Sequence, residues 1–337
     1  MRVEVDDRSG FCFGVVNAIS RAEACLEGSN HGSHCKPQSG PREEPGQDCE
    51  KHETHEVTKP LVSLGDIVHN GAEMARLEAL GLEVASENTD MATLAGRTVL
   101  IRAHGEPPET YSRARLHGVT LIDATCPVVA RLQKTVADAH AEMSRRGGQV
   151  VIFGQRGHAE VRGLTGQITG LQNKLREGAG GAPDGSRRPE VLVVEDEADL
   201  DAIDFARPVY FLAQTTGSLT EFRRLGDIIL NKSTRPEQVT IHDTICRQVA
   251  GREEHLAGFA RRFDVVVFVS GAKSSNGRVL FEAVRAANPN SHKIENIGEL
   301  RPEWFSKEAA VGVCGATSTP RWLMNEVAEA IQKTATK

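Results

Sequence analysis

The chain has few aromatic residues and no sequence pattern typical of nucleotide binding. Phe, Trp and Tyr make up only 4% of its 337 residues, too few to favour a platform on which bases stack. It contains no G-x-G-x-x-G or Walker sequence, which argues against a nucleotide cofactor. It also lacks an excess of positive charge, since 40 Lys and Arg face 46 Asp and Glu for a net charge of -6. A broad nucleic-acid or membrane surface is therefore disfavoured, and only a local basic pocket stays open.

Long hydrophobic runs are also missing. The longest, such as Val265–Val269, have the length of a strand and are far shorter than the roughly 20 residues of a membrane span. The first eight residues are mostly charged and contain no apolar signal-peptide segment. We therefore expect a cytoplasmic protein.

The seven cysteines are odd in number and include no C-x-x-C pair. This pattern disfavours a disulfide framework, zinc ribbons, thioredoxin-type redox pairs and clustered ferredoxin motifs. Any metal site built from these cysteines must combine residues that lie far apart in the sequence.

Two segments, 29–56 and 176–189, are rich in Gly, Pro, Ser and charged residues. Neither can bury enough apolar surface to offset the entropy of ordering, so we expect disordered-type surface loops, the first of them an insertion. Elsewhere short β-rich runs alternate with helical patterns, which predicts an α/β fold with parallel strands. The clearest expected strands are 98–101, 150–153, 191–194 and 265–269.

An internal repeat organises the chain. Cys12, Cys126 and Cys246 recur at intervals of roughly 115 to 120 residues, and a helical pattern follows each one. After each cysteine, two strands end in turns of small and polar residues. The first turns of the three repeats contain His69, His158 with Glu160, and Ser274 with Ser275 and Asn276; the second turns contain His104, Thr215 and Ser318.

In parallel sheets, ligands bind beyond the carboxyl ends of the strands, where helices begin. Three such domains around one axis would bring these turns to a shared cavity. Three thiolates can hold an iron–sulfur cluster and leave one iron of a four-iron cube open. The histidines and hydroxyls at helix starts suit phosphate or diphosphate, and buried Glu160 suits a proton donor. Taken singly, each residue has a simpler interpretation: a buried cysteine, as we expect for Cys25 and Cys314, a turn-capping histidine or a helix-start carboxylate.

The motifs resemble one family closely. The segments that carry the resemblance occur in order along nearly the whole chain: 10–15, 68–70, 103–105, 123–127, 157–160, 214–216, 245–246, 273–276 and 318–320. Together they are similar to the 4-hydroxy-3-methylbut-2-enyl diphosphate reductases, which catalyse the last step of the methylerythritol phosphate route to isoprenoids.

The resemblance implies three similar α/β domains with small parallel sheets, arranged trefoil-like around a central [4Fe-4S] cluster. The domains would span 14–126, 127–244 and 245–337, with 1–13 joining the third. Cys12, Cys126 and Cys246 would hold the cluster with one iron open. His69, His104, His158, Thr215, Ser274, Ser275, Asn276 and Ser318 would bind the substrate, and Glu160, Thr215 and His158 would act in catalysis.

The implied reaction uses two electrons and two protons to give isopentenyl and dimethylallyl diphosphates, with an electron donor such as ferredoxin or flavodoxin. Two other functions stay open from the residues alone. One is an aconitase-like iron–sulfur hydro-lyase. It is disfavoured by the diphosphate-type pocket and because a polycarboxylate substrate favours bidentate arginines, which we do not expect at the polar turns. The other is a non-enzymatic, cluster-based redox sensor, which needs neither Glu160 nor an anion pocket.

Overall fold

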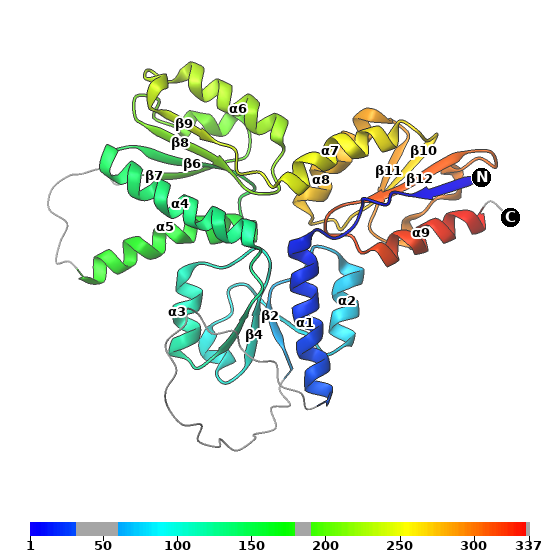
Figure 1. The fold of residues 1–337 in the computed structure, drawn as a ribbon, viewed down its shortest axis with the longest axis horizontal. Coiled ribbons are helices and arrows are strands. Elements are labelled where there is room, and N and C mark those ends of the chain that lie inside the picture. Colours follow the sequence, from blue (N-terminus) through cyan, green and yellow to red (C-terminus); the bar gives the residue numbers. More distant parts are fainter. Residues whose placement is uncertain (32–59, 179–189, 335–337) are drawn as a thin grey trace, which may run out of the picture.

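The computed structural model describes residues 1–31, 60–178 and 190–334. Its strands form three four-stranded parallel sheets, which lie in three lobes around a common centre (Figure 1). The trefoil-like α/β fold is therefore confirmed, together with the four expected strands. Among the described residues, no helix is both long and apolar enough to cross a bilayer.

The three sheets have the same strand order. They read β3-β2-β4-β5, β7-β6-β8-β9 and β11-β10-β12-β1. Because β1 pairs with β12 in parallel, the first strand of the chain completes the sheet of its last segment. The limits of the three domains stay a prediction. The strands are β1 Arg2–Val5, β2 Val62–Leu64, β3 Glu83–Ala85, β4 Thr98–Ile101, β5 Thr120–Asp123, β6 Gln149–Phe153, β7 Glu190–Val194, β8 Val209–Ala213, β9 Val239–His242, β10 Val265–Val269, β11 Ser291–Ile294 and β12 Ala310–Gly315.

Three helices accompany each sheet in the same chain order. The first helix of each unit begins just after one of the repeated cysteines, and the second begins after the first polar turn. The helices are α1 Phe13–His31, α2 Gly71–Ala79, α3 Pro108–Leu116, α4 Pro127–Arg146, α5 Ala159–Gly178, α6 Leu219–Lys232, α7 Arg247–Ala260, α8 Ser275–Ala287 and α9 Arg321–Thr334. The repeat found in the sequence is thus a repeat of structure.

Apolar periodicity explains where these helices bury their faces. In α4, Val129, Leu132, Val136, Ala139 and Met143 are all buried, as their spacing predicts. Pro127 occupies its first turn, where a missing backbone N–H costs no hydrogen bond. The central strands are buried along their whole length, for example β6 and β10, as is typical of sheets covered on both faces.

The two expected surface loops fall mainly outside the described residues. Helix α1 continues to His31, so the segment predicted as an insertion from residue 29 begins with the end of a helix. Likewise α5 continues to Gly178, three residues into the second predicted loop. The predicted loop limits differ from these helix ends because residue propensity alone places helix boundaries only to within a few residues.

Candidate functional site

Each repeated cysteine is held at a helix start by a backbone hydrogen bond. The N–H groups of Cys126, Cys246 and Cys12 donate to the carbonyls of Ala103, Thr215 and Thr317, over 3.0, 2.9 and 3.1 Å. Cys126 and Cys246 are the N-cap residues of α4 and α7, and neither side chain makes a capping hydrogen bond. The thiols are therefore left available to a ligand.

The three cysteines lie near one another although they come from three sheets. A Cβ atom built on Gly14 would lie 3.0 Å from Cys126 Sγ, so only glycine lets α1 approach that thiol so closely. Burial lowers the pKa of Arg252, and Cys12 and Cys246 lie close enough for their thiolates to act in the opposite direction. Burial raises the pKa of Cys12, and the neighbouring Cys126 adds to this effect.

This donor set fits a metal group that prefers thiolate ligands, because three half-buried thiols lie near one another without a disulfide. The other cysteines differ. Cys25 is buried in the core beside α2, and Cys314 is fully buried in β12, where burial raises the pKa of its thiol well above the usual value. Both agree with the interpretation as buried apolar side chains. Cys35 and Cys49 lie outside the described residues.

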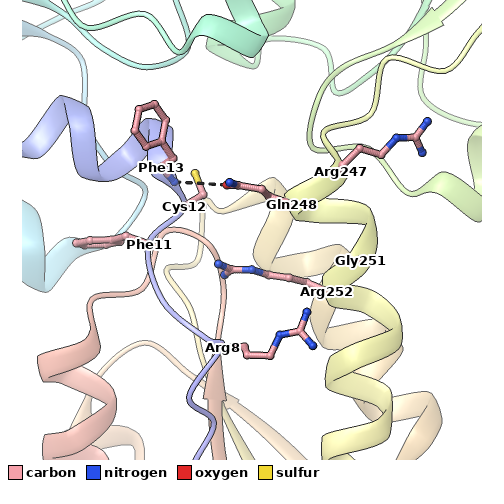
Figure 2. A pocket seen from close by; sticks show the side chains of 8 residues that line it. All are labelled: Arg8, Phe11, Cys12, Phe13, Arg247, Gln248, Gly251 and Arg252. Atoms are coloured by element: carbon pink, nitrogen blue, oxygen red, sulfur yellow. Dashed lines mark hydrogen bonds between the residues drawn. The ribbon is translucent and has the colours of Figure 1, made fainter.

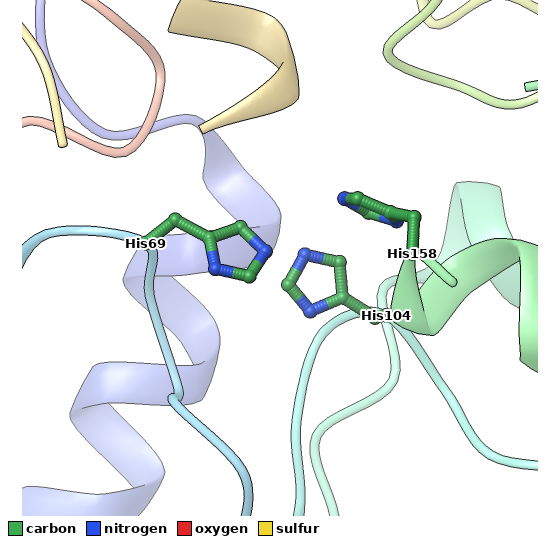
Figure 3. Close-up of side chains that lie close together, drawn as sticks. All are labelled: His69, His104 and His158. Carbon is green, nitrogen blue, oxygen red and sulfur yellow. The ribbon is translucent and has the colours of Figure 1, made fainter. Parts of the chain in front are cut away.

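Three histidine rings lie close together (Figure 3). The ring centroids of His69, His104 and His158 lie 5.0 to 5.5 Å apart. Both ring nitrogens of His69 and Nδ1 of His104 are buried and make no hydrogen bond to any residue that the structure describes. His158 Nδ1 accepts a hydrogen bond from the Glu160 N–H over 3.2 Å, which leaves Nε2 to carry the proton of the neutral ring.

Burial sets the charge of these rings. It lowers the pKa of His69, lowers that of His104 well below its usual value, and lowers that of His158 to about 4. Their nitrogens lie within 4.8 Å of one another and could hold a divalent metal. An anion is the alternative ligand, and it would raise all three pKa values because it favours the charged form of each ring.

The third lobe adds hydroxyl and amide groups beside the histidines. The Oγ atoms of Ser274 and Ser318 lie 3.1 Å apart, and Ser274 caps the N-terminus of α8. Ser275 and Asn276 are buried in the first turn of that helix. A Cβ built on Gly271 would lie 2.1 Å from the His69 carbonyl oxygen, so this glycine allows the turns of two lobes to touch. The hydroxyls and the free amides of the helix start favour an anion over a metal ion.

Glu160 and Thr215 form a buried pair at the start of α5. The Thr215 N–H donates to Glu160 Oε1 over 2.7 Å, and the Thr215 hydroxyl lies 2.8 Å from Oε2. Only 1% of Glu160 is exposed. Burial raises the pKa of Glu160 to about 7, although both hydrogen bonds from Thr215 act in the opposite direction. The group can therefore exchange a proton near neutral pH.

The repeat places an equivalent pair in the third lobe, which sequence reasoning missed. Asn276 Oδ1 accepts hydrogen bonds from the Thr317 N–H over 3.0 Å and from its hydroxyl over 2.7 Å. Asn276 thus occupies the place of Glu160, and Thr317 that of Thr215. The shared position of Thr215, Thr317 and Ala103 in the second turns was visible in the sequence and could have identified Thr317. Only the second lobe combines a carboxyl group with a hydroxyl here.

A buried ion cluster beneath the histidines was also missed. Arg102 is 1% exposed and forms an ion pair with Glu87, which in turn pairs with Arg162 on α5. Glu106 lies 3.9 Å from Arg102 and 3.7 Å from Arg162, and burial raises the pKa of its carboxyl group. Since arginine is rarely buried, nothing in the sequence distinguished Arg102 from a surface residue. The cluster joins the His104 turn to the helix that carries Glu160.

Comparison with known proteins gives consistent matches. The LytB protein family model matches residues 48–332. A 4-hydroxy-3-methylbut-2-enyl diphosphate reductase of Porphyromonas gingivalis is 45% identical over 98% of both chains, and that of Chloroherpeton thalassium is 40% identical over 99% of this chain and 97% of its own. A solved reductase, described as the terminal enzyme of the non-mevalonate pathway, is 29% identical over 99% of this chain and all of its own, with a TM-score of 0.61. The Plasmodium falciparum reductase, at 20% identity, covers 97% of this chain and 87% of its own and shows the same fold, with a TM-score of 0.73.

The ion cluster generates a prediction about stability. Replacing Arg102 with Met should lower the free energy of unfolding by about 1–3 kcal/mol, because Glu87 and Glu106 lose their most buried cationic partner and keep only Arg162. Arg113→Met is the matched control, since its ion pair with Asp90 is exposed, and it should have a much smaller effect. Denaturant unfolding of the two variants checks this, and equal effects would show that the cluster contributes no more than a surface pair.

Proposed function

The chain belongs to the LytB protein family, and from this we propose that it reduces 4-hydroxy-3-methylbut-2-enyl diphosphate to isopentenyl and dimethylallyl diphosphates. Members of this family are iron–sulfur enzymes of the non-mevalonate isoprenoid pathway. The observation that carries the proposal is the meeting of three kinds of group at one centre: three cysteines, three histidines and the buried Glu160–Thr215 pair. The reaction needs electrons, a site for the diphosphate and protons. The cysteines would serve the first need, the histidines the second and the Glu160–Thr215 pair the third.

The diphosphate would be bound at the starts of the helices that follow the polar turns. His69, His104 and His158 present imidazole nitrogens, several of them without a partner among the described residues. The hydroxyls of Ser274, Ser275 and Ser318, the amide of Asn276 and the N-terminus of α8 supply further donors. Such donors, together with the positive end of the helix dipole, stabilise a phosphate. The diphosphate would in turn raise the pKa of the histidines and make them cationic.

Glu160 would supply the proton that the departing hydroxyl group needs. In its protonated form Oε2 can donate to the Thr215 hydroxyl, 2.8 Å away, and Thr215 can pass its own proton to the substrate hydroxyl. With a pKa of about 7, Glu160 is able to give up and regain this proton near neutral pH. One proton then leaves with the oxygen as water, and a second is added to carbon, at either of two positions, to give the two products.

Cys12, Cys126 and Cys246 would hold the family's iron–sulfur cluster. A cluster of the [4Fe-4S] type with only these three protein ligands would supply electrons and a Lewis-acidic iron with an open position. Burial and the neighbouring thiol raise the pKa of Cys12 in the protein alone. Metal binding would reverse this, because the ligand is the thiolate.

The hydro-lyase alternative is not supported by the matches or by the arginines near the turns. Arg102 and Arg156 lie beside the polar turns, but both form ion pairs with carboxylates of the protein. They are therefore not free to clamp a polycarboxylate substrate. A redox sensor would not require the Glu160–Thr215 pair.

The function is tested by turnover of anaerobically prepared protein. With a chemical reductant and the hydroxylated diphosphate, we expect both isoprenoid diphosphates and water as products. Stoichiometric reduction of the cluster without any product would favour the sensor, and release of water without consumption of electrons would favour the hydro-lyase.

The cysteine assignment predicts which thiols hold iron. Serine at residue 12, 126 or 246 should strongly deplete the iron bound per chain, since a hydroxyl group is a poor replacement for a soft thiolate. Cys25→Ser and Cys314→Ser are the controls and should retain iron, as should serine at residues 35 and 49. Iron and sulfide analysis of the folded fraction decides this, and the assignment fails if Cys314→Ser loses iron while Cys246→Ser retains it.

The role of Glu160 predicts a loss of rate without a loss of binding. Glu160→Gln keeps the size and hydrogen-bonding capacity of the side chain but cannot donate a proton, so kcat should fall by about 10²–10⁴-fold. Glu253→Gln is the control, because burial on α7 also raises the pKa of Glu253 and its substitution should leave kcat unchanged. Steady-state kinetics with saturating reductant measure both variants. An unchanged kcat in Glu160→Gln would mean that the proton arrives by another route.

The raised pKa of Glu160 also predicts the pH dependence. Because the acid must be protonated to act, kcat should be constant below about pH 7 and fall as the pH rises above this value. Any residual activity of Glu160→Gln should lack this decline. A wild-type kcat that instead rises through pH 7 would indicate that Glu160 acts as a base.

A further inference from the structure

A basic groove opens directly beside Cys12 (Figure 2). It lies between the segment that leads into α1 and the first turns of α7, and its volume is about 300 Å³. Arg8, Arg247 and Arg252 line it, and no carboxylate lines it among the described residues. In a chain of net charge -6, this is a local concentration of positive charge at a cavity that Cys12 borders.

The three arginines have different surroundings. Arg252 is half-buried and donates to the Gly10 carbonyl over 2.6 Å, so it serves to hold the segment before Cys12. Arg8 and Arg247 are exposed. Asp243 partly offsets the charge of Arg247 at 3.1 Å, but 73% of the Arg247 side chain stays accessible. Arg8 lies 3.2 Å from His255 Nδ1 through one guanidinium nitrogen. Two exposed cationic side chains therefore lie at the rim.

Exposed apolar side chains lie next to the groove. Phe13, which follows Cys12, is 62% exposed, and Val16, one helical turn further on, is 46% exposed. Val128, two residues after Cys126, is 41% exposed, and Cys126 packs against Gly14 at the start of α1. Exposed apolar side chains thus follow two of the three cysteines, and Phe13 lines the same groove as the arginines. An apolar centre with a charged rim is typical of a protein-binding surface.

We propose that this surface, comprising Arg8, Phe13, Val16, Val128 and Arg247, is the docking site of a small acidic electron-carrier protein. The inference rests on the proposed function, which consumes two electrons for each substrate. Carboxylates on the carrier would meet the arginine rim, while its own redox centre would approach Cys12 across the apolar patch. Two reduced carriers would each lose one electron, and these two electrons together with two protons replace the C–O bond of the substrate by a C–H bond, one proton leaving with the oxygen as water and the other joining carbon.

Charge complementarity of this kind acts mainly on the rate of encounter. Interfaces of electron-transfer partners are small and short-lived, so a few rim charges have a large effect. The docking site does not use the histidines or Ser274, none of which lines the groove, so carrier and substrate need not compete.

The experiment compares two charge-reversed variants. Arg8→Glu/Arg247→Glu alters the rim, and Arg145→Glu/Arg223→Glu changes the net charge equally at exposed positions on α4 and α6. Each is assayed with substrate and either a reduced plant-type [2Fe–2S] ferredoxin or a photoreduced neutral deazaflavin. We expect the rim variant to raise the KM for ferredoxin at least tenfold and to weaken its dependence on salt. Its deazaflavin-driven rate should stay within about twofold of the wild-type rate.

Three results would overturn the proposal. The KM for ferredoxin could rise equally in both variants, or in neither. The KM for the diphosphate substrate could rise in the deazaflavin assay, which would make the groove the substrate entrance. If charge reversal impairs folding, Arg8→Gln/Arg247→Gln must still raise the KM for ferredoxin several-fold relative to Arg145→Gln/Arg223→Gln. If the wild-type protein forms no product when reduced by deazaflavin, the proposed function itself is refuted.

Discussion

The site depends on one backbone hydrogen bond that the chain makes three times. In each lobe the N–H of the cysteine donates to the carbonyl of a residue in the second polar turn, with distances of 2.9 to 3.1 Å. This bond fixes the thiol, at the start of one helix, relative to the turn that ends a central strand. Because every lobe uses it, the starts of α1, α4 and α7 and the polar turns bound to them come together near the common centre (Figure 1).

The three lobes carry different residues at equivalent positions, and these differences determine the chemistry of the site. The second residue of α2, α5 and α8 is Ala72, Glu160 and Asn276 in turn, and the second turns of the three lobes hold Ala103, Thr215 and Thr317. Glu160 and Asn276 are both buried, but only Glu160 can carry a proton, and its burial raises the pKa to about 7. The histidines come from the first two lobes and the serines from the third. A symmetric frame thus supports an asymmetric site, with acid chemistry in one lobe and further anion donors in another.

Much of this arrangement can be predicted from the sequence, since a strand-to-helix turn leaves a local signature. The spacing of the cysteines, the buried strands and the amphipathic pattern of α4 predict the repeated α/β fold. The polar turns that follow predict which residues meet. The burial of Arg102 and its pairing with Glu87 and Arg162 could not be predicted, because they depend on two lobes packing against each other. The exposed apolar side chains around Phe13 could not be predicted either, because the exposure of a side chain is a property of the assembled fold.

The central claim is that three cysteines, one from each lobe, hold a single cluster at the centre of the molecule. Mössbauer spectroscopy of anaerobically prepared, iron-57-labelled protein tests it most directly. The account predicts four irons per chain, one of which has a signal distinct from the other three and changes when the diphosphate substrate is added. Four equivalent irons unaffected by substrate, or only two irons per chain, would contradict it.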